Sequence, residues 1–92
     1  MIINAEKEIP HFKDKVRAVI NKYHTSRRPA EIMVMRVSGW PLRKICDFYS
    51  YKDLDPIYSN IRHALNRTQF DDAVMFAIDV TKYINNVFSE VS

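Results

Sequence analysis

Polar side chains that can hydrogen-bond to the edges of nucleic-acid bases recur at helical spacing in the segment 55–66. If this segment is a helix, its apolar residues gather on one face. The opposite face then carries Tyr58, Ser59, Arg62, His63 and Asn66. An arginine can bind guanine through two parallel hydrogen bonds, an asparagine can do the same with adenine, and a serine can bond to either base. No carboxylate follows Asp55 on this face, whereas a merely polar surface, which is the alternative interpretation, more often alternates acidic and basic residues.

Basic residues that can contact phosphate flank this segment and the chain before it: Arg27, Arg28, Arg43, Lys44, Lys52 and Arg67. Each could neutralise one backbone phosphate and add to a salt-dependent affinity, and each is equally compatible with an ordinary surface charge. Residues 1–67 hold 13 Lys and Arg against 7 Asp and Glu, whereas residues 68–92 hold one against four. This separation suggests a basic portion that faces a polyanion and a tail with another role, although chance is an alternative.

The sequence lacks the usual signatures of catalytic and metal-binding sites. It has no glycine-rich phosphate loop, no His-x-x-x-His pair and no cysteine pair, so we expect neither an enzyme nor a bound metal or cofactor. Cys46 and one of the scattered histidines could form a nucleophilic pair on paper. Cys46 falls on the inward stripe of its segment, however, where a small buried hydrophobic side chain is the expected role.

The composition favours one small all-helical domain. The chain has 92 residues, of which 47% are hydrophobic and 27% charged, as in globular proteins rather than disordered ones. A single glycine is few for a fold that depends on tight hairpin turns. The first ten residues, MIINAEKEIP, are too polar for a signal peptide or a membrane anchor, so a cytoplasmic protein with no membrane contact is expected.

Apolar residues at three- and four-residue steps predict four to five helices, spanning about 10–24, 29–37, 41–49, 55–66 and 68–89. The segment 29–37 is apolar on all sides and could instead be a buried strand, but Pro29 and Gly39 favour a central helix. A further turn at residues 5–9, capped by Asn4, is also compatible with the sequence.

Local capping residues predict where two of these helices begin. Asp55 is expected to cap the fourth helix, with Pro56 at its first position. Thr68 is expected to cap the last helix, with Asp71 three residues further on as the acidic partner of a capping box. The predicted inward stripe of the fourth helix is Ile57, Ile61, Ala64 and Leu65.

The stretch PAEIMVMRVSGWPLRKICDFYSYKDLDPIYSNIRHAL, residues 29–65, resembles the trihelical helix-turn-helix of sigma-factor region four, LuxR-type regulators, resolvases and small terminase subunits. The positions that match this pattern are Gly39, Leu42, Ile45, Cys46, Ile57 and Ile61. Ser50 stands where the turn of this family usually has glycine, and the link to the next helix is one residue longer. The resemblance implies that segment 55–66 enters the DNA major groove with its N-terminal half on the bases.

The segment 68–92 is predicted to be a long helix for dimerisation or packing, because it is apolar on two faces that both need burial. One stripe is Phe70, Val74, Ala77, Ile78, Ile84 and Phe88. The second, predicted to face the partner in a homodimer, is Ala73, Phe76, Val80, Tyr83 and Val87. Alternatively, both stripes pack into one intramolecular core against the first helix.

The sequence thus predicts a single domain, with a helix-turn-helix core at 29–67, that binds double-stranded DNA as a small transcriptional regulator or in DNA packaging. The alternative is a protein-interaction module, such as a small viral or plasmid-encoded inhibitor that binds a host protein. Structured RNA is a third, weaker alternative as ligand, because no recognised RNA-binding motif is present.

Overall fold

Six helices and no strands make up the secondary structure of residues 3–88, the part of the chain that the computed structural model describes. The predicted all-α fold is therefore confirmed. The helices are α1 (Ala5–Glu8), α2 (Phe12–Tyr23), α3 (Arg27–Val37), α4 (Leu42–Tyr49), α5 (Asp55–Asn66) and α6 (Ala73–Val87). No helix within these residues is both long and apolar enough to cross a membrane.

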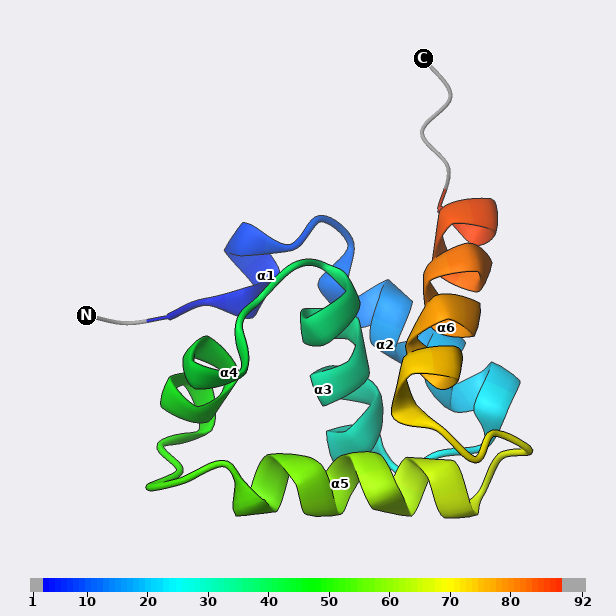
Figure 1. Ribbon diagram of the computed structural model, residues 1–92. Helices are drawn as coiled ribbons and strands as arrows, with labels where there is room; N and C mark the ends of the chain where they lie inside the picture. The colour runs from blue at the N-terminus through cyan, green and yellow to red at the C-terminus, as the bar shows by residue number, and fades with distance from the viewer. Residues whose placement is uncertain (1–2, 89–92) are drawn as a thin grey trace.

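Helix α3 stands at the centre, in contact with α2, α4, α5 and α6 (Figure 1). Its residues Ile32, Val34 and Met35 are completely buried, which explains why the segment is apolar on all sides and could be read as a strand. The segment is helical, and it begins at Arg27, two residues before the predicted start. Pro29 fits inside the first turn because the N–H groups there have no partner within the helix.

Two helices end in the same backbone geometry, in which one residue adopts a left-handed conformation. Gly39 (φ +100°) and Trp40 donate their amides to carbonyls in the last turn of α3, both at 3.1 Å. Ser50 (φ +60°) and Tyr51 donate to carbonyls in the last turn of α4 at 3.2 and 2.9 Å. Both pairs form the helix-ending Schellman motif, which favours glycine at the left-handed position. Ser50 thus occupies a position where glycine would be less strained.

The start of α5 differs by one residue from the prediction. Asp55 is the first helical residue rather than the cap, and Leu54 occupies the cap position. The Asp53 carboxylate accepts a hydrogen bond from the Asp55 amide at 3.0 Å. Asp53 and Asp55 are two residues apart, and it is the carboxylate of Asp53 that accepts the hydrogen bond from the first amide of the helix. Asp55 still places a negative charge in the first turn, where the helix dipole favours it.

The start of α6 lies five residues after the predicted Thr68. Its cap is Asp72, whose side chain accepts a hydrogen bond from the Val74 amide at 2.8 Å. The Thr68 hydroxyl instead donates to the Leu65 carbonyl at 3.1 Å, so it closes α5. A helix start is set by which nearby acceptor reaches free amides, and Asp72 does so here. The predicted end at Ser89 lies outside the described residues.

The N-terminal region adds a one-turn helix before α2. Asn4 caps α1 as predicted, because its side chain accepts hydrogen bonds from the amides of Glu6 (3.0 Å) and Lys7 (3.3 Å). The helix predicted from Pro10 begins at Phe12, after His11 in a left-handed conformation (φ +57°).

Candidate nucleic-acid interface

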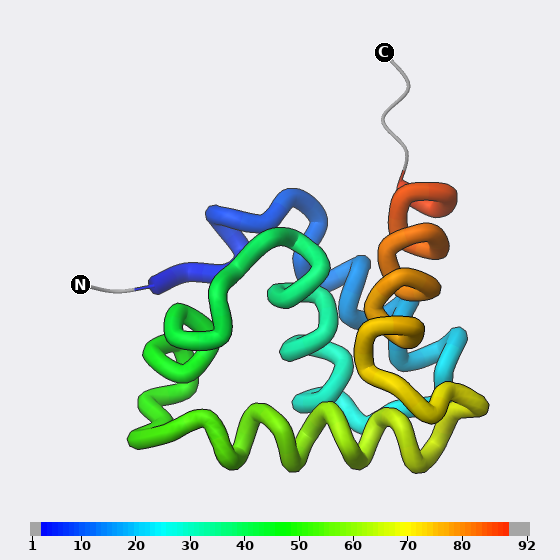
Figure 2. The backbone as a smooth tube through the Cα atoms, viewed as in Figure 1, coloured from blue at the N-terminus to red at the C-terminus, as the bar shows by residue number. Residues whose placement is uncertain are grey.

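Helix α5 lies along one edge of the molecule, with α3 standing on its inner face (Figures 1 and 2). Ile57 and Ala64 anchor that inner face and are 0% and 1% exposed, while Ile61 and Leu65 are half-buried. The outer face is therefore uncovered. All five predicted base-reading side chains are exposed: Tyr58, Ser59, Arg62, His63 and Asn66.

These exposed side chains differ in how available they are to a ligand. Within residues 3–88, the side chains of Ser59, Arg62 and Asn66 make no hydrogen bond or ion pair. Tyr58 is 47% exposed and lies on the flank of α5 that faces α6, where it borders a groove. Asn60 is occupied, because its amide donates to the Pro56 carbonyl at 2.8 Å. The available groups thus concentrate from Ser59 to Asn66.

Charge is unevenly distributed along α5. Asp53 and Asp55 lie at its N-terminal end, accompanied by Lys52, and all three are exposed. Arg62 and Arg67, both exposed, lie in its C-terminal half and just beyond it. The predicted readout by the N-terminal half would bring two carboxylates towards phosphates, whereas the C-terminal half presents only neutral and basic groups.

Two of the predicted phosphate-binding arginines have partners within the protein. Arg27 forms an ion pair with Glu31 at 3.1 Å. Arg28 donates to the Tyr51 hydroxyl and stacks over the Tyr49 ring, with its guanidinium 4.6 Å from the ring centroid. The Arg27 side chain is 75% exposed, although that of Glu31 is only 17% exposed, so Arg27 can exchange its partner. Arg28 is held by a ring as well as a hydrogen bond, which favours a structural role.

Lys44 is also engaged. It forms an ion pair with Glu8 of α1 and lies 4.4 Å from the centroid of the Trp40 ring. The first turn of α4 is therefore partly covered by α1, a contact between residues 36 positions apart that periodicity does not reveal. Among the described residues, three predicted phosphate contacts have no ion pair or side-chain hydrogen bond: Arg43, Lys52 and Arg67.

Cys46 has a structural role in the link before α5. It is 1% exposed, its Sγ donates to the Asp53 carbonyl at 3.3 Å, and burial raises the pKa of its thiol. A raised pKa keeps the thiol protonated and weakly nucleophilic. No cluster of three or more His, Cys, Asp or Glu side chains that could hold a metal ion forms within residues 3–88.

The stripe of α6 that was predicted to face a dimer partner is largely inside the protein's own core. Phe76 and Val80 are 0% exposed, which corrects their assignment to a dimer interface. Ala73 and Tyr83 are half-buried, and only Val87, at 50%, is well exposed.

Aromatic contacts with α2 help to bury this stripe, together with the packing of α6 against α3. The Tyr23 ring packs edge-on against Phe76, with centroids 5.1 Å apart, and against Tyr83 at 6.2 Å. The stripe that contains Val74 and Ile78 is instead exposed in its first half, where Val74 is 63% and Ile78 44% exposed.

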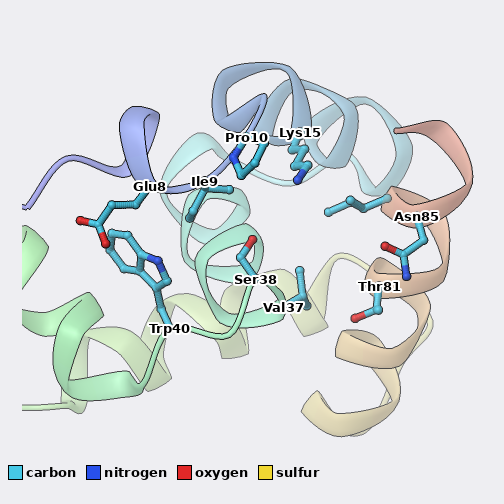
Figure 3. Close-up of a pocket in the computed structure, with 10 residues that line it drawn as sticks. Glu8, Ile9, Pro10, Lys15, Val37, Ser38, Trp40, Thr81 and Asn85 are labelled. Carbon is cyan, nitrogen blue, oxygen red and sulfur yellow. The ribbon is translucent and has the colours of Figure 1, made fainter. Parts of the chain in front are cut away.

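A groove and a cleft both border α6. An apolar groove of about 740 Å³ lies between α3, α5 and α6. Apart from the spacing of Val74 and Ile78, no pattern in the chain pointed to it. A smaller cleft of about 240 Å³ lies between α1, the α3–α4 corner and α6 (Figure 3). Lys15 and Asn85 border this cleft, but Glu8, its one carboxylate, is paired with Lys44.

Comparisons with protein-family models, with curated proteins and with solved structures find no match to this chain.

Proposed function

We propose that this protein binds double-stranded DNA sequence-specifically through α5, as a small transcriptional regulator that acts as a cytoplasmic homodimer. One observation carries the proposal: the uncovered outer face of α5 has no carboxylate between Pro56 and Arg67. The major groove admits one α-helix and exposes base edges to it. A solvent-facing helix without a DNA role has no need to exclude acidic side chains over three turns.

Arg62 and Asn66 are the proposed principal base readers, because both are exposed, unbonded within residues 3–88 and one turn apart on the same face. Ser59 and His63 stand beside them, and Tyr58 lies at the flank. Arg43, Lys52 and Arg67 are the proposed phosphate contacts, since none of them is engaged by another described side chain. Phosphate contacts position the protein, and base contacts provide sequence preference.

The carboxylates of Asp53 and Asp55, at the N-terminal end of α5, bear on which part of the helix enters the major groove most deeply. Asp53 accepts the Asp55 amide and is held at the helix start, so it cannot turn away from a phosphate placed there. We therefore propose that α5 inserts with its middle and C-terminal half deepest. This orientation keeps Asp53 and Asp55 away from the phosphates.

The test is fluorescence-polarisation binding to duplex DNA at about 50 and 200 mM salt, with Arg17→Ala as a matched control for Arg62→Ala. Arg17 is exposed on α2, outside the α5 face, and has no partner within residues 3–88. We expect affinity to fall steeply with salt and Arg62→Ala to lose about 1–3 kcal/mol on a selected site. Absence of binding at the lower salt, or equal effects of both variants, would reject α5 as the reader.

A protein-interaction module, such as an inhibitor of a host protein, is the second candidate. The apolar groove beside α6 favours it, because a contiguous exposed apolar surface commonly marks a protein-binding site. Binding through such a surface depends little on salt, which separates it from phosphate contacts.

A further inference from the structure

The apolar groove between α3, α5 and α6 is the largest hollow described above, at about 740 Å³. Met33 and Val37 line it from α3, Ile61 from α5 and Ala77 from α6, with Leu42 at the start of α4. Its lining contains no acidic residue, and two cations, Arg36 and Lys82, lie at its border. The groove is therefore a surface made for apolar side chains with a basic margin.

A ridge of apolar side chains runs beside this groove on the first two turns of α6. Val74, Met75 and Ile78 are 63%, 54% and 44% exposed, at spacings that put them on one side of the helix. Val74 and Ile78 also line the groove, whereas Met75 does not. A ridge and a groove thus lie side by side on one surface.

This juxtaposition identifies the occupant. A small ligand could fill the groove but would leave the protruding Met75 in water. A second copy of the chain satisfies both features, because a two-fold axis sets the ridge of each copy against the groove of the other. We propose that this surface is the interface of a symmetric homodimer, with α6 of one protomer packed antiparallel across α6 of its partner.

Charge supports the antiparallel arrangement. Asp71 and Asp72 precede the ridge, and Lys82 follows it; all three are exposed. Asp72 and Lys82 are ten residues apart, or about 15 Å along a helix. An antiparallel pairing centred on their midpoint, Ala77, brings the acidic pair of each protomer beside Lys82 of the partner subunit. A parallel pairing would place like charges together.

The dimer stands on its own geometry, and only its consequence for DNA depends on the proposed function. Tyr58 and Ile61 of α5 border the groove, so the two-fold axis passes near both α5 helices. Two α5 helices related in this way would read two half-sites of a palindrome.

The first test measures molar mass by sedimentation velocity for the full chain and for Ile78→Asp over about a hundredfold range of concentration. We expect a dimer for the parent chain and a monomer for Ile78→Asp, with unchanged helical circular dichroism in both. Asn86→Asp, which adds the same charge at an exposed position of α6 outside the ridge and groove, is the control and should remain dimeric.

A charge exchange tests the orientation. Asp71→Lys and Lys82→Glu should each weaken the dimer by about tenfold or more, because each places like charges across the interface. The double variant, Asp71→Lys with Lys82→Glu, again places opposite charges at positions 71 and 82 of facing protomers. It should recover most of the lost dimer affinity. A parallel dimer would show no recovery.

Two outcomes would overturn the proposal. A parent dimer that Ile78→Asp leaves intact would put the interface elsewhere. A parent chain that stays monomeric throughout, while Ile78→Asp abolishes its binding of the apolar anion 8-anilinonaphthalene-1-sulfonate, would assign the groove to a small ligand. Neither outcome bears on the proposed DNA binding, because a monomeric Ile78→Asp chain retains α5 and should still bind single half-sites with salt dependence.

Discussion

The Tyr23 hydroxyl donates a hydrogen bond to the Asp79 carboxylate and joins α2 to α6 across 56 positions of sequence. The same ring packs edge-on against Phe76. This contact fixes which side of α6 turns inward, because a buried hydroxyl needs a partner and a ring needs apolar neighbours. The position of the remaining apolar ridge, and hence of the proposed dimer interface, follows from it.

Loss of this hydrogen bond should destabilise the fold. Tyr23→Phe leaves the half-buried Asp79 without its donor, and we expect a loss of about 1–3 kcal/mol in the free energy of unfolding. Urea denaturation followed by circular dichroism measures it. Tyr58→Phe is the matched control, since that ring is 47% exposed, and it should change stability by less than about 0.5 kcal/mol. Equal effects of both variants would show that the contact is not formed.

Alkaline pH should unfold the protein through two phenols, the buried Tyr23 and the half-buried Tyr49. Burial, and then hydrogen bonds to Asp79 and Glu31, raise the pKa of Tyr23 and of Tyr49 above the ordinary 10.0. The folded state keeps protons that the unfolded state releases, so this stabilisation is complete below pH 10 and is lost as pH rises towards the raised pKa values. Tyrosinate absorbance should therefore rise in two steps, the second coinciding with loss of circular dichroism. A single step near pH 10 with intact helices would contradict this expectation.

The left-handed residues at two helix ends should respond oppositely to substitution. Ser50→Gly removes backbone strain at φ +60° and should stabilise the fold by about 1 kcal/mol. Gly39→Ala introduces strain at φ +100° and should destabilise by about 1–2 kcal/mol, although an added Cβ meets no atom within 4 Å. Thermal unfolding reports both. Ser38→Gly, at an ordinary φ of −80°, is the control and should not stabilise.

The cap of α6 gives a test of where that helix begins. Asp72→Ala should cost about 1 kcal/mol, because the Val74 amide loses its acceptor. Asp71→Ala removes the same charge next to it without a hydrogen bond and should cost clearly less. The comparison of their urea midpoints checks the assignment. A larger effect at Asp71 would favour the capping box expected from Thr68.

Two arginines of the α5 region should separate base reading from phosphate binding. Arg62→Ala should relax preference at one base pair, because a bidentate contact to guanine provides discrimination. Arg67→Ala should weaken all sequences equally and reduce the salt slope of affinity by about one. Selection from random duplexes, followed by titrations at several salt concentrations, measures both. An unchanged preference in Arg62→Ala would remove it from the base-reading set.

The sequence by itself predicted the all-α fold and the helical state of α5. It favoured a helix over a buried strand for α3, and it was compatible with Asn4 as the cap of α1. Each depends on local information. Gly39 ends α3 because it alone among these residues has no Cβ to strain, and the stripe through Ile57 and Ala64 fixes which face of α5 turns inward. The same periodicity predicted that Arg62 and Asn66 would be exposed.

Only the tertiary structure decided which faces found partners. Periodicity shows that Phe76 and Val80 share one side of α6 and that Val74 and Ile78 share another, but not which side meets α2. Lys44 had the pattern of an exposed cation, yet it pairs with Glu8. Which helix faces are buried depends on contacts between segments far apart in the chain, because the apolar faces of a small domain compete for a limited inner surface. An apolar face that stays uncovered is available as a binding surface.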